Sequence, residues 1–190
     1  MANYTIADKK KEILSKFCSP QLAIIQSLNN CDNRKVEELD IDKFLAVLYF
    51  SNAQFNAPCF ERRMVLKGWK KVPASDNNGD FKIKGFGRNI ELNCSFPNKA
   101  NTINLRQIRL WQNTDYIITF CDYCNYKHIV LFLTHEVLEE AVKKFGTASH
   151  GTSKANEENK NIEYSITIKL NDIGYWKKYE NKKLMNFMFS

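Results

Sequence analysis

Two acidic residues, Asp80 and Glu91, lie on neighbouring predicted strands that cover residues 79–84 and 90–96. The glycine-containing turn at 85–87 can bring their carboxylates together. Paired carboxylates on strands suit a hard cation, because Mg²⁺ takes oxygen ligands and is bound by one or two carboxylates plus substrate phosphates. The spacing therefore predicts a candidate phosphodiester-cleaving site. A solvated hairpin with two ordinary surface acids is the alternative interpretation.

The composition predicts one globular domain with a basic balance of charge. The chain has 190 residues, of which 44% are hydrophobic and 26% charged, which is long enough for one well-buried domain and short for two. A net charge of +7 favours a polyanionic partner, because neutralising phosphates releases condensed counterions; solubility alone also accounts for such a surplus. Without an apolar run of membrane-spanning length or a leader-like start, we expect a cytoplasmic protein that does not associate with membranes.

Helical and strand patterns alternate along the chain and divide it into three parts of a single domain. We expect an N-terminal helical part (1–56), a catalytic core (57–170) and a C-terminal helical segment (171–190). Periodicity and turn residues predict helices over 7–17, 20–28, 43–50, 57–67, 104–112 and 134–145. Strands are predicted over 69–72, 79–84, 90–96, 115–122, 127–133 and 163–170.

The order of the polar residues resembles that of a known nuclease superfamily. A helical acid, Glu61, precedes the two strand acids, and a predicted helix with Gln107 follows them. This order resembles the PD-(D/E)xK nucleases, and residues 57–170 are similar to the small type II restriction endonucleases. The segments that carry the resemblance are Trp69 with Val72-Pro73-Ala74-Ser75, Gly79-Asp80-Phe81-Lys82, Glu91-Leu92, Arg106-Gln107-Ile108-Arg109-Leu110-Trp111-Gln112 and Ser149-His150-Gly151-Thr152. The resemblance implies a restriction-endonuclease-like α/β fold with a central mixed β-sheet flanked by helices.

The resemblance also implies a role for each residue of the motif. Asp80 and Glu91 would bind Mg²⁺, or Mn²⁺ in its place, with the carbonyl of Leu92 as a third ligand. Glu61 would act as an outer acid through water, and Gln107 would orient water or phosphate near the site. A bound cation polarises a phosphoryl oxygen and lowers the pKa of water, which agrees with phosphodiester hydrolysis.

The sequence departs from the family pattern at Asn93, where the motif lysine is expected two residues after Glu91. An amide offers hydrogen bonds but no positive charge for the pentavalent phosphate. Three explanations stay open. A lysine from elsewhere replaces it, with Lys82, Lys84 and Lys99 nearest in sequence; Asn93 suffices with the metal; or the chain binds DNA without cutting it.

Contacts with DNA are predicted mainly for the polar segment 147–161. Serine, threonine and lysine suit phosphates, and asparagine suits base edges. An ordinary mobile surface loop is the alternative. The candidate DNA-binding residues are Arg62, Arg88, Arg106, Arg109, His150, Thr152, Ser153, Lys154, Asn156 and Lys160.

Cys121, Cys124 and His128 have the spacing of half a zinc knuckle. A structural zinc needs a fourth ligand, and both flanking segments are predicted core strands, so we favour reduced core thiols. A dyad of Cys94 and His150 has no support from its spacing.

The resemblance implies a Mg²⁺-dependent, sequence-specific endonuclease that cuts double-stranded DNA and leaves 5′-phosphates. Cutting both strands of a palindrome calls for two sites, so a homodimer is expected, with a cognate DNA methyltransferase as genetic partner. The recognition sequence and cut stagger depend on a few side chains and on DNA shape. A non-catalytic DNA-binding domain and a structural or interaction protein are the rival functions.

Overall fold

The centre of the fold is a mixed five-stranded sheet. The computed structural model describes residues 14–28, 33–51, 53–73, 76, 78–96, 102–123, 125, 127–149 and 162–190, so the helix expected over 7–17 lies mostly outside it. The strands are ordered β1-β2-β3-β5-β6. Their bounds are β1 Lys70–Lys71, β2 Phe81–Lys82, β3 Ile90–Ser95, β5 Asp115–Asp122 and β6 Lys127–Leu133. Because β3 and β5 are parallel and the other pairs antiparallel, the predicted mixed sheet is confirmed.

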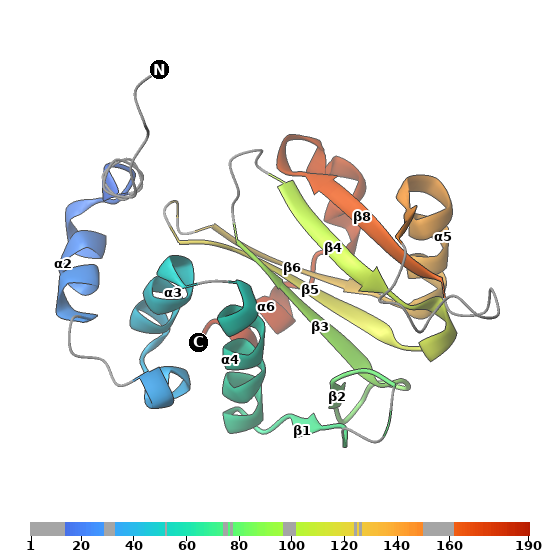
Figure 1. The fold of residues 1–190 in the computed structure, drawn as a ribbon, viewed down its shortest axis with the longest axis horizontal. Helices are drawn as coiled ribbons and strands as arrows, with labels where there is room; N and C mark the ends of the chain where they lie inside the picture. The colour runs from blue at the N-terminus through green and yellow to red at the C-terminus, as the bar shows by residue number, and fades with distance from the viewer. Residues whose placement is uncertain are drawn as a thin grey trace.

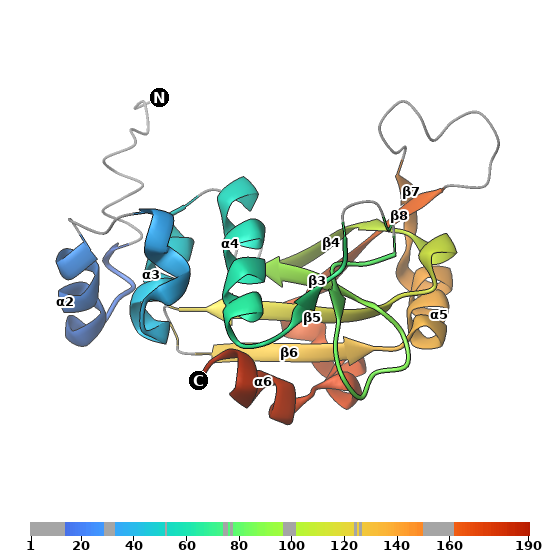
Figure 2. The same cartoon turned by 90° about the horizontal axis from the view of Figure 1, so that it is seen from below.

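A second, antiparallel sheet packs against one face of the first. It has the order β4-β8-β7, with β4 Thr102–Ile108, β8 Glu163–Lys169 and β7 Thr147–Ser149. The helix α5, His135–Phe145, shares this core, which includes Ile103, Ile118, Leu138 and Ile166. In Figures 1 and 2, α5 lies on the opposite side of the strands from α2 and α3.

The predicted helix over 104–112 is wrong. Residues 102–108 form β4, and a short 3₁₀ turn, η3 (Leu110–Gln112), follows it. Ile103 and Leu105 are buried while Asn104 is exposed, which is the alternation of a strand. The loop predicted over 147–161 likewise begins as β7, and residues 150–161 lie outside the described residues.

The remaining helices cover the other face of the central sheet. Phe44, Phe60 and Met188 from three helices pack there against Phe81 and Ile117. The elements on this face are α2 Ser19–Ser27, η2 Asn33–Glu38, α3 Ile41–Phe50, α4 Ala53–Leu66 and α6 Lys182–Met188. The short turns η4 Leu170–Tyr175 and η5 Lys177–Tyr179 pack instead in the core that α5 shares with the second sheet. None of the helices within the described ranges is long and apolar enough to span a membrane.

The helix α4 begins four residues earlier than the predicted Ala57 start, so Pro58 lies inside it rather than at its first turn. It ends as predicted at Gly68, which has a φ of 94°, because a glycine takes the left-handed conformation without steric cost. The chain then enters β1. This short connection places α4 beside the edge of the sheet that carries the predicted acids.

Candidate functional site

The backbone of Asp80 is held between β1 and β3. Its N–H donates to the carbonyl of Ile90 at 2.8 Å, and its own carbonyl accepts from the N–H of Val72 at 2.8 Å. The Asp80 carboxylate accepts a hydrogen bond from the Leu92 N–H at 2.9 Å. Asp80 therefore points along β3, next to Glu91.

Gly79 allows this close approach. It has a φ of 80°, and a Cβ at this position would lie 3.0 Å from the Ile90 carbonyl oxygen and 3.1 Å from Thr114 Cγ2. A side chain would therefore push the segment away from β3 and strain its backbone. The glycine is a structural requirement for placing Asp80.

The electrostatics of Glu91 and Asp80 show that the acids share one site. Burial, together with the negative charges of Asp80 and Glu61, raises the pKa of Glu91 to about 7, although the charge of Arg109 opposes the rise. Burial also raises the pKa of Asp80, against the hydrogen bond from Leu92. The charge of Glu61 adds to this rise. The structure thus brings together the three acids that the sequence placed in order.

Glu61 reaches the site from α4 and is held by a lysine that sequence analysis missed. Lys71 Nζ lies 2.7 Å from Glu61 Oε2, and the Glu61 side chain is 17% exposed. Lys71 also lowers the pKa of Asp80. Lys71 pairs with Phe81, the neighbour of Asp80, across β1 and β2. The predicted strands over 69–72 and 79–84 could have indicated this position.

Leu92 and Asn93 present different groups toward the acids. The N–H and the carbonyl of one strand residue point to the same edge of the strand. Because the Leu92 N–H is bonded to Asp80, its carbonyl faces the acidic edge, while its side chain packs in the helical core. Asn93 lies on the same face of β3 as Glu91, and its Oδ1 accepts from Ser95 Oγ at 3.4 Å.

The strand β4 delivers Arg109, rather than Gln107, to the site. The pairing of β4 with β8 is irregular between Leu105 and Ile108, and Gln107 has a φ of 58° at this bulge. Gln107 is exposed. Arg109 follows the strand, and its charge lowers the pKa of both Asp80 and Glu91.

The other predicted DNA-binding residues divide into three groups. Arg62 pairs with Glu37 at 3.2 Å, and Arg88 pairs with Glu136 and, at 3.5 Å, with Asp115. Arg106 is exposed at the bulge. The residues outside the described part of the chain are His150, Thr152, Ser153, Lys154, Asn156 and Lys160.

No protein family and no curated protein matches this sequence. The functional interpretation therefore depends on the residues and their geometry. Within the described ranges no group of three or more His, Cys, Asp or Glu side chains is arranged to hold a metal ion. A cation at Asp80 and Glu91 would take two carboxylates, the Leu92 carbonyl, and water or phosphate. An all-oxygen donor set of this kind fits Mg²⁺, which usually keeps several waters.

The predicted half zinc knuckle is divided between described and undescribed residues, since Cys124 lies outside the described ranges. Cys121 pairs with His128 across β5 and β6 and is buried in the helical core. The His128 ring stacks on Phe189 at 4.5 Å, and burial lowers its pKa. Cys121 and His128 thus behave as core side chains.

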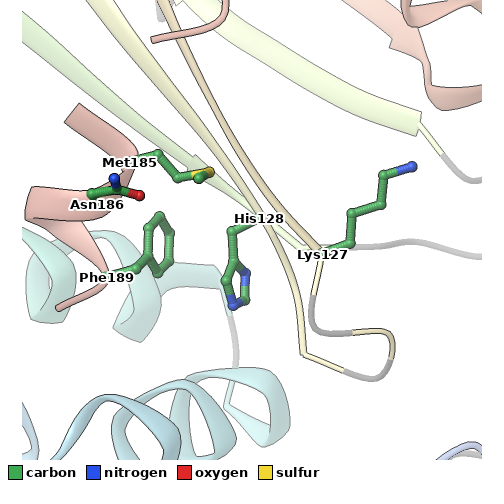
Figure 3. A pocket seen from close by; sticks show the side chains of 5 residues that line it. All are labelled: Lys127, His128, Met185, Asn186 and Phe189. Atoms are coloured by element: carbon green, nitrogen blue, oxygen red, sulfur yellow. The ribbon is translucent and has the colours of Figure 1, made fainter. Parts of the chain in front are cut away.

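A cavity of about 450 Å³ lies beside His128, and Figure 3 shows the side chains that line it. Met185, Asn186 and Phe189 of the α6 region form one side, and Lys127 extends away from them (Figure 3). His128 lies opposite Cys121, on the helical face of the sheet. Glu91 lies opposite Tyr116, on the other face. This cavity is therefore distinct from the acidic site, and its lining residues in the described ranges include no carboxylate.

Proposed function

We propose that the chain is a Mg²⁺-dependent, sequence-specific endonuclease of double-stranded DNA with a restriction-endonuclease-like fold. The observation that carries the proposal is the placement of Asp80, Glu91 and Glu61 in one partly buried site, where burial and the neighbouring acids raise the pKa of Glu91 to about 7. Uncompensated neighbouring carboxylates are costly in a partly buried site. A divalent cation removes that cost, so the crowding favours a metal-binding role.

Each residue has a distinct part in the proposed reaction. Asp80, Glu91 and the carbonyl of Leu92 would hold the cation, Mg²⁺ or Mn²⁺, which polarises a phosphoryl oxygen and lowers the pKa of water when bound. Asp80 is oriented by its 2.9 Å hydrogen bond from Leu92. Glu61 and Asn93 would orient the attacking water and the phosphate by hydrogen bonds. Water attacks phosphorus, the bond to the 3′ oxygen breaks, and a 5′-phosphate and a 3′-hydroxyl remain.

Several further features support a DNA substrate and the expected partners. The net charge of +7 favours a polyanion, and Arg106 is exposed close to Arg109 in the sequence. Cutting both strands of a palindromic site requires two active sites, which a two-fold homodimer supplies. We therefore propose a cytoplasmic homodimer, with a cognate DNA methyltransferase as its genetic partner.

Cleavage of mixed-sequence plasmid and phage DNA with millimolar Mg²⁺ or Mn²⁺ tests the proposal. The unaltered chain should give discrete fragments, and Asp80→Ala should give none. Glu140→Ala is the matched control, because Glu140 is an exposed acid on α5, and it should cut as the unaltered chain does. Fragments that persist in Asp80→Ala would refute the assigned site.

The alternative is a non-catalytic DNA-binding domain on the same fold, and the observation that favours it is Asn93. Salt-dependent DNA retention without cleavage, both in the unaltered chain and in Asn93→Lys, would support that function. Cleavage by Asn93→Lys alone would indicate an intact metal site that lacks one positive charge.

A further inference from the structure

The proposed reaction needs a positive charge that position 93 does not supply. Negative charge develops on the phosphoryl oxygens as water attacks, and preorganised cationic donors stabilise it. Asn93 is neutral, and Asp80 and Glu91 add negative charge at the same place. A cationic side chain from another part of the fold must therefore face the phosphate.

The backbone of Arg109 is held over the strand pair that carries Glu91. Its N–H donates to Tyr116 Oη at 3.3 Å. Tyr116 pairs with Glu91 across β3 and β5, and paired residues on neighbouring strands have their side chains on the same face. Arg109 therefore lies on the face of the sheet from which Glu91 projects.

The guanidinium of Arg109 is oriented by Glu163 of β8. Arg109 Nε lies 2.9 Å from Glu163 Oε1, and the two side chains are 32% and 12% exposed. Because Glu163 contacts Arg109 through Nε, the Arg109 guanidinium stays partly open to solvent and its plane has a defined direction. Such a fork binds two phosphate oxygens at once, which an ammonium group does not do.

Among the described residues, two cationic side chains influence the charges of the acids. Lys71 comes from β1, and Arg109 follows the end of β4. Lys71 is bound to Glu61 at 2.7 Å and acts on Asp80. Arg109 acts on both Asp80 and Glu91. Lys71 is occupied by Glu61, whereas Arg109 lies on the Glu91 face of the sheet with its guanidinium oriented by Glu163, so Arg109 is the better placed to contact a phosphate at the acids.

We propose that Arg109 contacts the scissile phosphate and supplies the positive charge that Asn93 lacks, with Glu163 as its positioning residue. This inference rests on the proposed nuclease function. Arg109 is then a catalytic residue contributed by the second sheet. Lys71 in turn keeps Glu61 in place.

Single-turnover DNA cleavage with enzyme in excess tests the inference, because this measurement separates the chemical step from DNA binding. Arg109→Gln should lower the rate by about 10²–10³-fold, while DNA affinity in EDTA falls less than about tenfold. Arg109→Lys should recover part of the rate. Lys169→Gln is the control, since Lys169 is an exposed cation on the same sheet, and it should cut normally.

Restoring a lysine at position 93 provides the decisive variant. Residue 93 lies on the Glu91 face of β3, so Asn93→Lys combined with Arg109→Gln should regain at least about tenfold in rate. That rescue would also show that Arg109→Gln folds. An unchanged rate in Arg109→Gln, or a double variant as slow as Arg109→Gln, would each overturn the inference.

Failure of the inference and failure of the proposed function give different results. If the unaltered chain does not cut DNA but Asn93→Lys does, the nuclease function holds and the role of Arg109 is refuted. If neither chain cuts DNA, both are refuted.

Discussion

Replacing Glu91 with glutamine should stabilise the metal-free protein near neutral pH. Glutamine keeps the shape of the side chain and removes one charge from the crowded acids. The pKa of Glu91 is raised from 4.5 to about 7 by burial and by its acidic neighbours, so its charged form is unfavourable in the folded state. The substitution should relieve that unfavourable charge, although it removes a proposed metal ligand.

The sign and size of the effect follow from proton linkage. Between pH 4.5 and about 7 the folded state binds more protons at Glu91 than the unfolded state does, so the free energy of unfolding falls as pH rises. The stabilisation that protonated Glu91 gives the folded state is complete below pH 4.5 and lost above about pH 7. At 1.36 kcal/mol per pKa unit, the full loss is about 3 kcal/mol. Because the glutamine amide is also partly desolvated, we expect the variant to gain about 1–2 kcal/mol.

Urea unfolding in EDTA, at about pH 5 and about pH 8, measures this difference. Glu91→Gln should exceed the unaltered chain in stability at the higher pH and nearly equal it at the lower. Glu140→Gln is the control, because Glu140 is an exposed acid on α5. A loss of stability in Glu91→Gln at the higher pH, or an equal gain at both values, would refute the reasoning.

Mg²⁺ provides an independent test in the same assay. Ligand binding to the folded state raises the free energy of unfolding. Mg²⁺ should therefore stabilise the unaltered chain at about pH 8, where no proton at Glu91 competes with the cation, and leave Glu91→Gln nearly unchanged, because glutamine removes one of the two proposed carboxylate ligands.

Three further substitutions have defined effects. Gly79→Ala should destabilise the protein by about 1–3 kcal/mol in urea unfolding and also reduce cleavage, because its new Cβ would lie 3.0 Å from the Ile90 carbonyl and displace Asp80. Thr134→Ala should cost about 1 kcal/mol and leave cleavage intact, since the Thr134 side chain caps α5 by accepting from the N–H of Val137 and has no part in the proposed reaction; a loss of cleavage would contradict this. Arg63→Lys should cost about 1–3 kcal/mol in thermal unfolding, because the 7% exposed Arg63 donates from Nη1 to two backbone carbonyls and its planar guanidinium lies 4.6 Å from the Phe44 ring centroid, a contact that the shorter lysine loses; equal stability would contradict that.

Local patterns were sufficient for most of the central elements. The strands β5 and β6 have the predicted bounds, because a continuous apolar run rich in β-branched and aromatic residues is typical of a strand buried on both faces. The helix α5 begins after Thr134, whose side chain accepts from the N–H of Val137, and ends before Gly146. Cap and stop residues act over one turn, so they can be identified from sequence alone.

The error over 104–112 has a specific physical cause. A β-bulge adds one residue to a strand, so two core-facing residues on either side of it are three apart instead of two. Leu105 and Ile108 have this spacing across the bulge, and both are buried. A spacing of three is also that of one helical face. The sequence pattern of a bulged strand therefore imitates that of a helix.

The proximity of the acids could be predicted from the sequence, whereas their cationic partners could not, because the two sets differ in their separation along the chain. Asp80 and Glu91 meet across a short turn between adjacent strands. Arg109 meets Glu163 across 54 positions of the sequence, and this pair depends on the second sheet, which the false helix excluded. The lysines nearest in sequence, Lys82 and Lys84, were candidates by proximity alone.

The charges around the site give a reason for its proposed dependence on a divalent cation. Within the described part of the chain, six charged side chains form the site or adjoin it: Glu61, Asp80, Glu91, Glu163, Lys71 and Arg109. When all are ionised, the acids exceed the cations by two charges, which one divalent cation balances. A phosphate approaching the metal-free site meets net negative charge, whereas the metal-bound site presents the guanidinium of Arg109 without that repulsion. The arginine and the metal are therefore complementary, because the cation neutralises the acids and leaves Arg109 available to the phosphate.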